Sequence, residues 1–241
     1  MKRVAVFVEG QTELIFVREL LYRFFDPSIL SFKCTKMHAQ SLVDVPYGYS
    51  SPEPEIHFLL INVQNDKGVV SAIRDREKGL MESGFDQIIG LRDMYSEAYD
   101  KRSPGVINDS VSRQFINAAQ STIQGMQYGA RIRLHFSIME IEAWFLSMYN
   151  IFGRYNSKLS VEKIKRNLGF DLRTIDSEKE FFHPANQVKA IYALIGLKYD
   201  KKKGDIERIA RKMDCQDFLD ALGGGRCGCF DLFCQHLVSC R

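Results

Sequence analysis

The segment Val4-Ala5-Val6-Phe7-Val8-Glu9-Gly10-Gln11-Thr12-Glu13 joins an uncharged apolar run to an acid, a glycine and the start of a helical pattern. The residues from Val4 to Val8 are all apolar, and three of them are β-branched. This composition is typical of a strand buried on both faces of a parallel sheet. A strand that turns directly into a helix places Glu9 at the carboxyl end of the strand, where open α/β sheets bind their ligands. The helical pattern is carried by Leu14, Val17, Leu20, Leu21 and Phe24.

Two acids flank the glycine of this segment. Gly10 allows a tight turn and a close approach of the backbone to a ligand, and Glu13 follows in the first helical turn, near enough to share a site with Glu9. An acid in a first turn also complements the helix dipole, which by itself would explain Glu13. The dipole does not explain Glu9 at the tip of an apolar strand, so Glu9 is the stronger functional candidate.

The same alternation of buried strand and amphipathic helix continues along the chain. We expect strands at 56–63, 85–91 and 131–138, and helices at 68–83, 110–126 and 139–149. This βαβαβαβα order predicts an α/β fold, a parallel sheet with helices on both faces. Residues 27–55, rich in proline, are expected to form a long excursion with one short strand near 31–37.

The pattern changes after Asn150. Only short helical segments are expected, at 160–168, 185–195, 204–213 and 215–222, and Gly223-Gly224-Gly225 is interpreted as a flexible joint before a cysteine-rich tail. The sequence therefore predicts two domains, with a catalytic domain at 1–150 and a small C-terminal helical lobe at 151–241.

Three motifs carry a resemblance to a known group of proteins. They are Val8-Glu9-Gly10-Gln11-Thr12-Glu13, the segment Ile88–Tyr95 and the segment His135–Leu146. Together they resemble Toprim-like proteins related to the OLD-family nucleases, and look like the small family catalogued as DUF4276. The likeness covers residues 1–150 well and the remainder loosely. It implies the Toprim fold, a central role for the acid Glu9 and a metal-ligand role for Asp93. It also implies a phage-defence effector that works beside a separate ATPase.

The candidate site consists of acids that follow predicted strand ends. Carboxylates placed side by side repel each other unless cations intervene, and Mg²⁺ or Mn²⁺ is the usual remedy because these hard ions take oxygen ligands. Two such ions ~3.5–4 Å apart can activate a water and stabilise the leaving oxygen in phosphodiester cleavage. We expect the catalytic acids to be Glu9, Glu13 and Asp93, and the metal ligands to be Glu9, Glu13, Asp93, Glu140 and Glu142.

The sequence departs from the Toprim pattern at Tyr95, where the Asp-x-Asp motif of that group would place a second aspartate. Glu140 or Glu142 is then the candidate to compensate, but residues two apart on one helix point about 200° apart. We therefore expect only one of the two to face the metals and the other to be an exposed surface acid.

A basic loop, Tyr199–Asp205, offers a lysine to such a site. A charge run of this kind is usually a solvated surface. The similar family has a lysine-bearing segment of this type, however, and a lysine can stabilise the charge that develops in a transition state. We take Lys202 as the candidate catalytic lysine.

Composition places the chain among globular proteins, with 45% apolar residues and a net charge of +3 that says little about partners. No apolar run approaches the ~18 residues of a membrane span, so we expect a cytoplasmic protein with reduced cysteines. The C-x-C-x₄-C-x₅-C run from Cys227 to Cys240, with His236, offers the ligand types of a zinc site. This spacing has no clean match among structural zinc sites, which favours unpaired thiols.

Two functions remain open on this sequence. The first is a Mg²⁺- or Mn²⁺-dependent nuclease that cleaves DNA or RNA. The second is a catalytically degenerate Toprim module that binds nucleic acid or a partner protein. The acids Glu9, Asp93 and Glu140 or Glu142 favour the enzyme, and Tyr95 favours the binding module.

Overall fold

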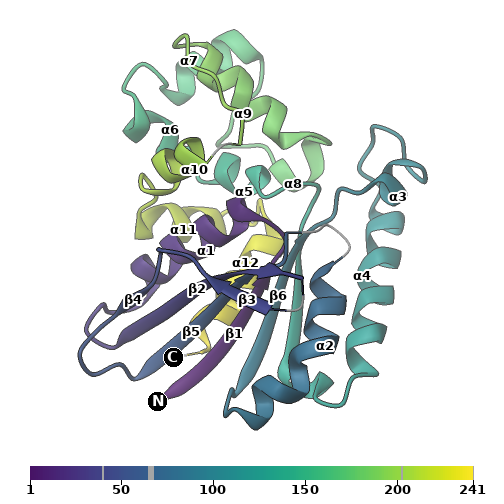
Figure 1. The fold of residues 1–241 in the computed structure, drawn as a ribbon. Helices are drawn as coiled ribbons and strands as arrows, with labels where there is room; N and C mark the ends of the chain where they lie inside the picture. Colours follow the sequence, from purple (N-terminus) through teal and green to yellow (C-terminus); the bar gives the residue numbers. More distant parts are fainter. Residues whose placement is uncertain (40, 65–67, 202, 241) are drawn as a thin grey trace. The chain divides into compact units, whose positions relative to one another are not determined.

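The computed structural model describes residues 1–39, 41–64, 68–201 and 203–240. The chain forms two compact units, and each is assembled from separate stretches of sequence (Figure 1). We call the first the sheet unit; it comprises Met1–Arg92, Arg113–Phe136 and His236–Arg241. We call the second the helical unit; it comprises Asp93–Ser112 and Ser137–Gln235.

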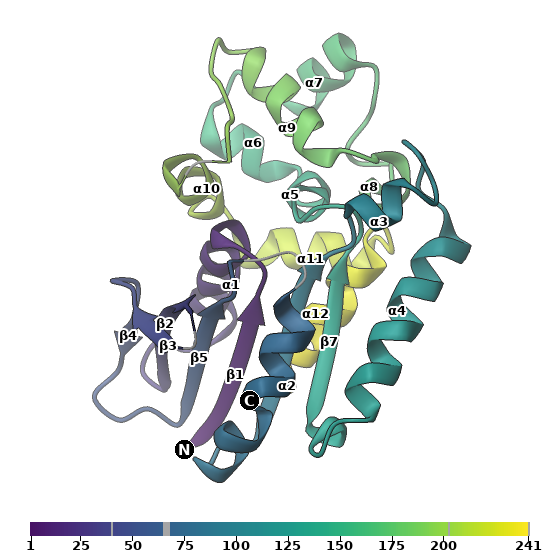
Figure 2. The same ribbon diagram turned by 45° about the vertical axis from the view of Figure 1, so that its right-hand side comes forward.

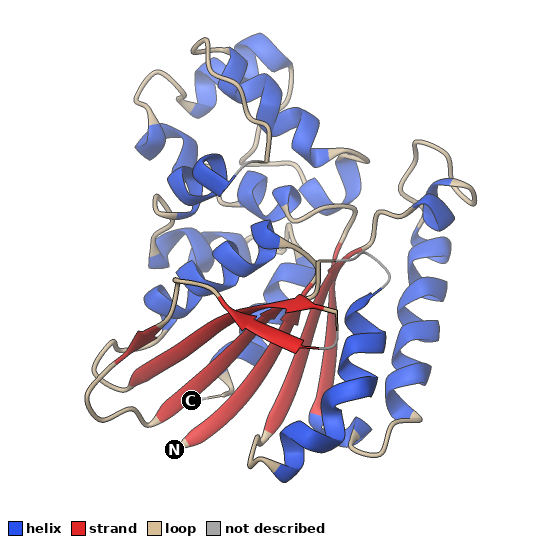
Figure 3. Ribbon diagram, in the orientation of Figure 1, coloured by secondary structure: helices blue, strands red, loops and turns tan. Residues whose placement is uncertain are grey.

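Within the described residues, the sheet unit is built on a seven-stranded sheet in the order β3-β2-β5-β1-β6-β7, with β4 paired to β2 (Figure 3). β1 is parallel to β5 and β6, and β2 is parallel to β5, whereas β3 and β4 pair with β2 in antiparallel fashion. The strands are β1 (Lys2–Val8), β2 (Leu30–His38), β3 (Ser41–Asp44), β4 (Tyr49–Ser50), β5 (Ile56–Asn62), β6 (Gln87–Asp93) and β7 (Ile132–Ser137).

Helices cover both faces of this sheet (Figure 2): α1 (Gln11–Phe24) and α2 (Gly68–Glu82) lie on opposite sides, and α4 (Asp109–Gln124) lies on the side of α2. Ala5 and Phe7 of β1 belong to the core cluster that α2 completes. Successive residues of a strand point to opposite faces of the sheet. Since helices cover both faces, Val4 to Val8 are all fully buried. The predicted α/β fold with a mostly parallel sheet is confirmed.

The packing between α2 and the sheet requires a glycine in β6. A Cβ atom on Gly90 would lie 2.6 Å from Leu134 Cδ1 and 2.9 Å from Ile73 Cδ1. Since real side-chain atoms do not approach this closely, the helix can sit at its observed distance only if residue 90 has no side chain.

The excursion at 27–55 is more regular than expected. The strand predicted near 31–37 is present as β2, but it runs from Leu30 to His38 and continues through β3 and β4 into a three-stranded antiparallel extension. Phe32, Tyr22 and Tyr49 pack together, with the rings of Tyr22 and Phe32 5.0 Å apart. These aromatic contacts give a proline-rich segment enough buried surface to hold strand structure.

The helical unit consists of short helices. α5 packs against α8 and α9, α7 against α9, and α6 against α10. The elements of this part of the chain are α3 (Glu97–Asp100), α5 (Glu142–Ser147), α6 (Asn150–Tyr155), α7 (Val161–Leu168), α8 (Ser177–Glu180), α9 (Pro184–Ala193), α10 (Lys203–Ala210), α11 (Cys215–Gly223) and α12 (Gly228–Val238), and the sheet unit adds a 3₁₀ turn, η1 (Gly129–Arg131).

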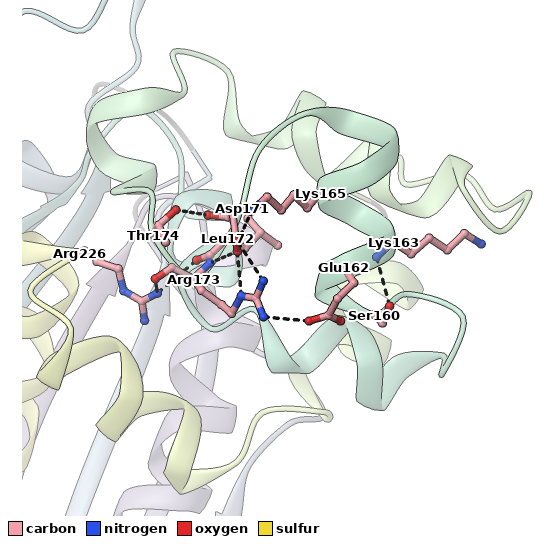
Figure 4. A network of polar contacts seen from close by, with 9 residues as sticks. All are labelled: Ser160, Glu162, Lys163, Lys165, Asp171, Leu172, Arg173, Thr174 and Arg226. Atoms are coloured by element: carbon pink, nitrogen blue, oxygen red, sulfur yellow. Dashed lines mark hydrogen bonds and ion pairs between the residues drawn. The ribbon is translucent and has the colours of Figure 1, made fainter.

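The expected joint at the glycine run is held in place, and the tail beyond it is a helix. Arg226 donates to the carbonyl oxygens of Leu172 (3.3 Å) and Arg173, in the turn that Figure 4 shows beside α7. The first turn of α12 is fixed by Glu178, whose Oε2 accepts from the Cys229 backbone N–H at 2.9 Å. None of the six cysteines forms a disulfide in the described part of the chain. None of the described helices has the length and apolar composition that crossing a membrane requires.

Candidate acidic site

Two strand ends meet in the helical unit and position the first acid. Ser137, the last residue of β7, donates its hydroxyl to Asp93, the last residue of β6. The segments that follow are joined by backbone hydrogen bonds, from Met94 N to Ser137 O and from Tyr95 N to Met139 O, both 2.9 Å. Asp93 is half-buried. Its carboxylate is therefore held in one orientation by a neighbouring strand rather than left on a mobile loop.

Two further acids converge on one lysine. Lys201 Nζ lies 2.7 Å from Glu140 Oε1 and 3.1 Å from Glu142 Oε2. The other oxygens of both acids are also engaged: Tyr199 donates its hydroxyl to Glu142 Oε1 at 2.7 Å, and the Ala185 backbone N–H donates to Glu140 Oε2 at 3.2 Å. Since Ala185 lies in the first turn of α9, Glu140 also complements the positive end of that helix.

The expectation that Glu140 and Glu142 diverge on one helix is wrong. α5 begins only at Glu142, and Glu140 lies in a turn in which Met139 has a left-handed backbone with φ of 62°. The turn rotates Glu140 to the same side as Glu142, and Glu142 is fully buried rather than an exposed surface acid. Lys201 is also left-handed, with φ of 55°. Such conformations are costly for residues other than glycine and tend to gather at functional sites.

The charges of this cluster depend on each other. Burial raises the pKa of the Glu142 carboxyl, and Lys201 opposes that rise. Burial alone would lower the pKa of Lys201, but Glu142, Glu140 and the more distant Asp93 raise it overall, so the ammonium stays charged. A positive charge is therefore fixed among three acids that would otherwise repel one another.

The sheet unit carries the other two predicted acids. Glu9 follows β1 and is half-buried, and Glu13 is buried in the first turn of α1. A Cβ atom on Gly10 would lie 2.9 Å from Glu13 Oε2, which explains the glycine between the two acids. Beside them, Asn62 at the end of β5 donates to Gln11 Oε1 at 3.3 Å. The prediction that Glu9 shares one cleft with Asp93 and with either Glu140 or Glu142 concerns both units and stays a prediction.

The donors suit a hard cation in kind, because Asp93, Glu140 and Glu142 offer only carboxylate oxygens. Within the residues that the structure describes, however, no three His, Cys, Asp or Glu side chains are grouped as a metal site. The positive charge next to Glu140 and Glu142 is the ammonium of Lys201. Bound Mg²⁺ or Mn²⁺ would therefore share or replace that interaction.

The predicted catalytic lysine, Lys202, lies outside the described residues, so its role stays a prediction. Its neighbour in the same basic loop, Lys201, contacts the acids. Ser137 and Tyr199 were missed. The sequence signal for Ser137 is a hydroxyl between the apolar residues Phe136 and Ile138, near the end of the strand expected at 131–138.

The fold and the site define an α/β protein that bears an acidic, lysine-bridged cluster. The chain matches the family model described as "Domain of unknown function (DUF4276)" over residues 8–237, and it belongs to this family. No curated protein and no solved structure matches the chain.

Proposed function

We propose that the chain is a Toprim-like phosphodiesterase, related to the OLD-family nucleases, that cleaves DNA or RNA with Mg²⁺ or Mn²⁺. The observation that supports this most is the convergence of Glu140, Glu142 and Lys201 beside Asp93. Glu142 is fully buried, and the burial of a carboxylate carries a considerable desolvation cost. A salt bridge on the surface would avoid this cost, so the buried arrangement favours a functional role for the cluster.

Each residue of the cluster has a chemical task in this proposal. Asp93 and Glu140 would hold the divalent ion, and such an ion supplies a water of lowered pKa and a positive charge for the phosphate. Ser137 orients Asp93, and Tyr199 fixes Glu142. Lys201 would stabilise the negative charge that develops on the phosphate oxygens.

A second function has a specific observation in its favour. Lys201 already offsets part of the negative charge of Glu140 and Glu142, and an aromatic residue, Tyr95, follows Asp93 at a spacing of two. A catalytically degenerate module that binds nucleic acid or a partner protein would retain these contacts for structure alone.

The two functions differ in a cleavage experiment. The purified protein is incubated with single- and double-stranded DNA and RNA in Mg²⁺, Mn²⁺ or chelator, alongside Asp93→Asn and Glu140→Gln. Glu97→Gln is the matched control, since that acid is 81% exposed and pairs with Lys101, which is 72% exposed. Metal-dependent cleavage that is lost in the first two variants and kept in the control supports the enzyme. Binding without cleavage in any metal supports the module.

The role of the sheet unit's acids has a separate test. Glu9 is predicted to be a metal ligand, so Glu9→Gln should weaken Mn²⁺ binding in a calorimetric titration without unfolding the protein. Equal affinity of both forms for Mn²⁺ would remove Glu9 from the ligand set. We further propose a cytoplasmic setting and a role in phage defence beside a separate ATPase, which rest on the family resemblance.

A further inference from the structure

Three aromatic rings form a cluster next to the acids of the helical unit. The ring of Tyr95 lies 5.0 Å from that of His183 and 5.9 Å from that of Phe182, and the rings of Phe182 and His183 are 4.8 Å apart. All three contacts are edge-to-face, with interplanar angles of 86°, 65° and 82°. This geometry holds each ring in a defined orientation.

One ring of the cluster packs on a buried residue, and the other two are exposed. Phe182 packs on Tyr99 (6.3 Å), which is fully buried and shares a hydrogen bond of 2.9 Å with Ser112. Tyr95, by contrast, has 36% of its surface exposed, and His183 is exposed too. Exposed aromatic rings that adjoin one another, rather than lying scattered singly, form the kind of surface on which a ligand packs.

Both open rings are tied to the acidic cluster through the backbone. Tyr95 N donates to Met139 O, which directly precedes Glu140, and Asp93 lies two residues before Tyr95. His183 precedes α9 by one residue, and the second residue of that helix, Ala185, donates to Glu140. A group that packs on Tyr95 and His183 is therefore adjacent to the acids that we propose for phosphodiester cleavage.

We propose that Tyr95 and His183 form a stacking platform for an unpaired base, and that the substrate class of this site is single-stranded nucleic acid. An aromatic ring can stack on any base, because every base has a π-face. In a duplex those faces are covered by neighbouring base pairs, so only an unstacked base can use the platform. A base held there would place its adjoining phosphate towards Asp93 and Glu140.

This inference rests on the proposed function, so it is tested by binding in the absence of cleavage. Fluorescence anisotropy of a labelled single-stranded oligonucleotide is measured in chelator and in Ca²⁺, for the wild type and for Tyr95→Ala, Tyr95→Phe and His183→Ala. The control is Leu219→Ala, which removes an apolar side chain that is 60% exposed on α11. Thermal unfolding of each variant verifies that it folds.

Loss of one stacking partner should raise the dissociation constant for Tyr95→Ala about 5- to 150-fold, the range seen when base-stacking aromatics are removed. Tyr95→Phe, which keeps the ring, and Leu219→Ala should stay within about twofold of the wild type. An oligonucleotide with one abasic position in the bound register should weaken wild-type binding similarly and cost Tyr95→Ala nothing more, because the two changes remove the same contact.

The outcomes separate this inference from the proposed function. If binding follows these expectations and no cleavage occurs in Mg²⁺ or Mn²⁺, the stacking platform is supported and the proposed phosphodiesterase activity is contradicted. If the protein cleaves the oligonucleotide but Tyr95→Ala and His183→Ala leave its dissociation constant unchanged, the phosphodiesterase activity is supported and the stacking platform is overturned. A preference for duplex over single-stranded oligonucleotides, or no binding of either, also overturns it.

Discussion

Replacing Lys201 by methionine removes a positive charge that the structure places between Glu140 and Glu142. Methionine is unbranched and replaces the apolar stem of the lysine almost fully, so the change is chiefly electrostatic. Two acids, one of them fully buried, are then left without their cation. Because burial already raises the pKa of Glu142, the loss of Lys201 makes the ionised form of this acid still less favourable.

The size of the effect follows from the exposure of the partners. Breaking a buried ion pair costs about 3–5 kcal/mol, whereas an exposed pair contributes about 0–1 kcal/mol. The side chains of Glu142, Glu140 and Lys201 are 0%, 15% and 34% exposed, which places this cluster between the two limits. We expect Lys201→Met to lower the free energy of unfolding by about 2–3 kcal/mol.

Urea unfolding at neutral pH measures this loss, and Lys101→Met is the matched control. Lys101 lies 2.7 Å from Glu97, the same distance as in the Lys201–Glu140 pair, but its side chain is 72% exposed and that of Glu97 is 81% exposed. The control should lose at most about 0.5 kcal/mol. Mn²⁺ should restore Lys201→Met, because a ligand at about a hundredfold excess over its dissociation constant stabilises a protein by about 2.7 kcal/mol.

Two results would refute this reasoning. If Lys201→Met costs no more than Lys101→Met, the acids do not depend on the ammonium. If Mn²⁺ stabilises the wild type and Lys201→Met equally, the lysine and the divalent ion do not compete for the same carboxylates.

Three further predictions concern the support of the fold. Burial, His236 and Arg133 lower the pKa of His135 to about 3, so the unfolded chain takes up a proton below pH ~6.5 and the folded one does not. The contribution of His135 to the free energy of unfolding is therefore fully present above that pH and falls by up to about 1.4 kcal/mol per pH unit below it. His135→Gln should reduce the fall in melting temperature between pH 7 and pH 5, and an unaltered dependence on pH would contradict this. Gly90→Ala should destabilise by about 1–3 kcal/mol through overpacking, whereas Gly79→Ala, with open space around it, should be neutral or stabilising in the same melts. Glu178→Gln leaves either Trp144 Nε1 or the Cys229 N–H without an acceptor; it should cost about 1–3 kcal/mol and shift the fluorescence of the chain's one tryptophan, and an unshifted spectrum would refute this.

The elements that periodicity predicts well are those whose burial is uniform. β1 and α1 could be predicted because an uncharged run followed by helical spacing has one physical interpretation, a covered strand and an amphipathic helix. β3 and β4 could not, since short strands held by aromatic contacts such as Tyr22 with Tyr49 carry no periodic signal.

The site shows the same division. Acids at strand ends, Glu9 and Asp93, stand out because an apolar run ends in a charge. The position of Glu140 depends on the left-handed backbone of Met139, and no propensity rule places a methionine there. Lys201 reaches Glu140 across a sequence separation of 61, a contact that only the tertiary structure supplies.

Cleavage of an oligonucleotide with one sulfur-substituted phosphate tests metal-dependent phosphodiester cleavage most directly. Sulfur is a softer ligand than oxygen and binds Mg²⁺ poorly, whereas Mn²⁺ accepts it more readily. If an ion contacts the scissile phosphate, the unmodified single strand is cut in both metals, and the substituted strand is cut in Mn²⁺ but only slowly in Mg²⁺. Cleavage that persists in chelator, or a sulfur substitution that lowers the cleavage rate equally in Mg²⁺ and in Mn²⁺, would contradict the proposed function.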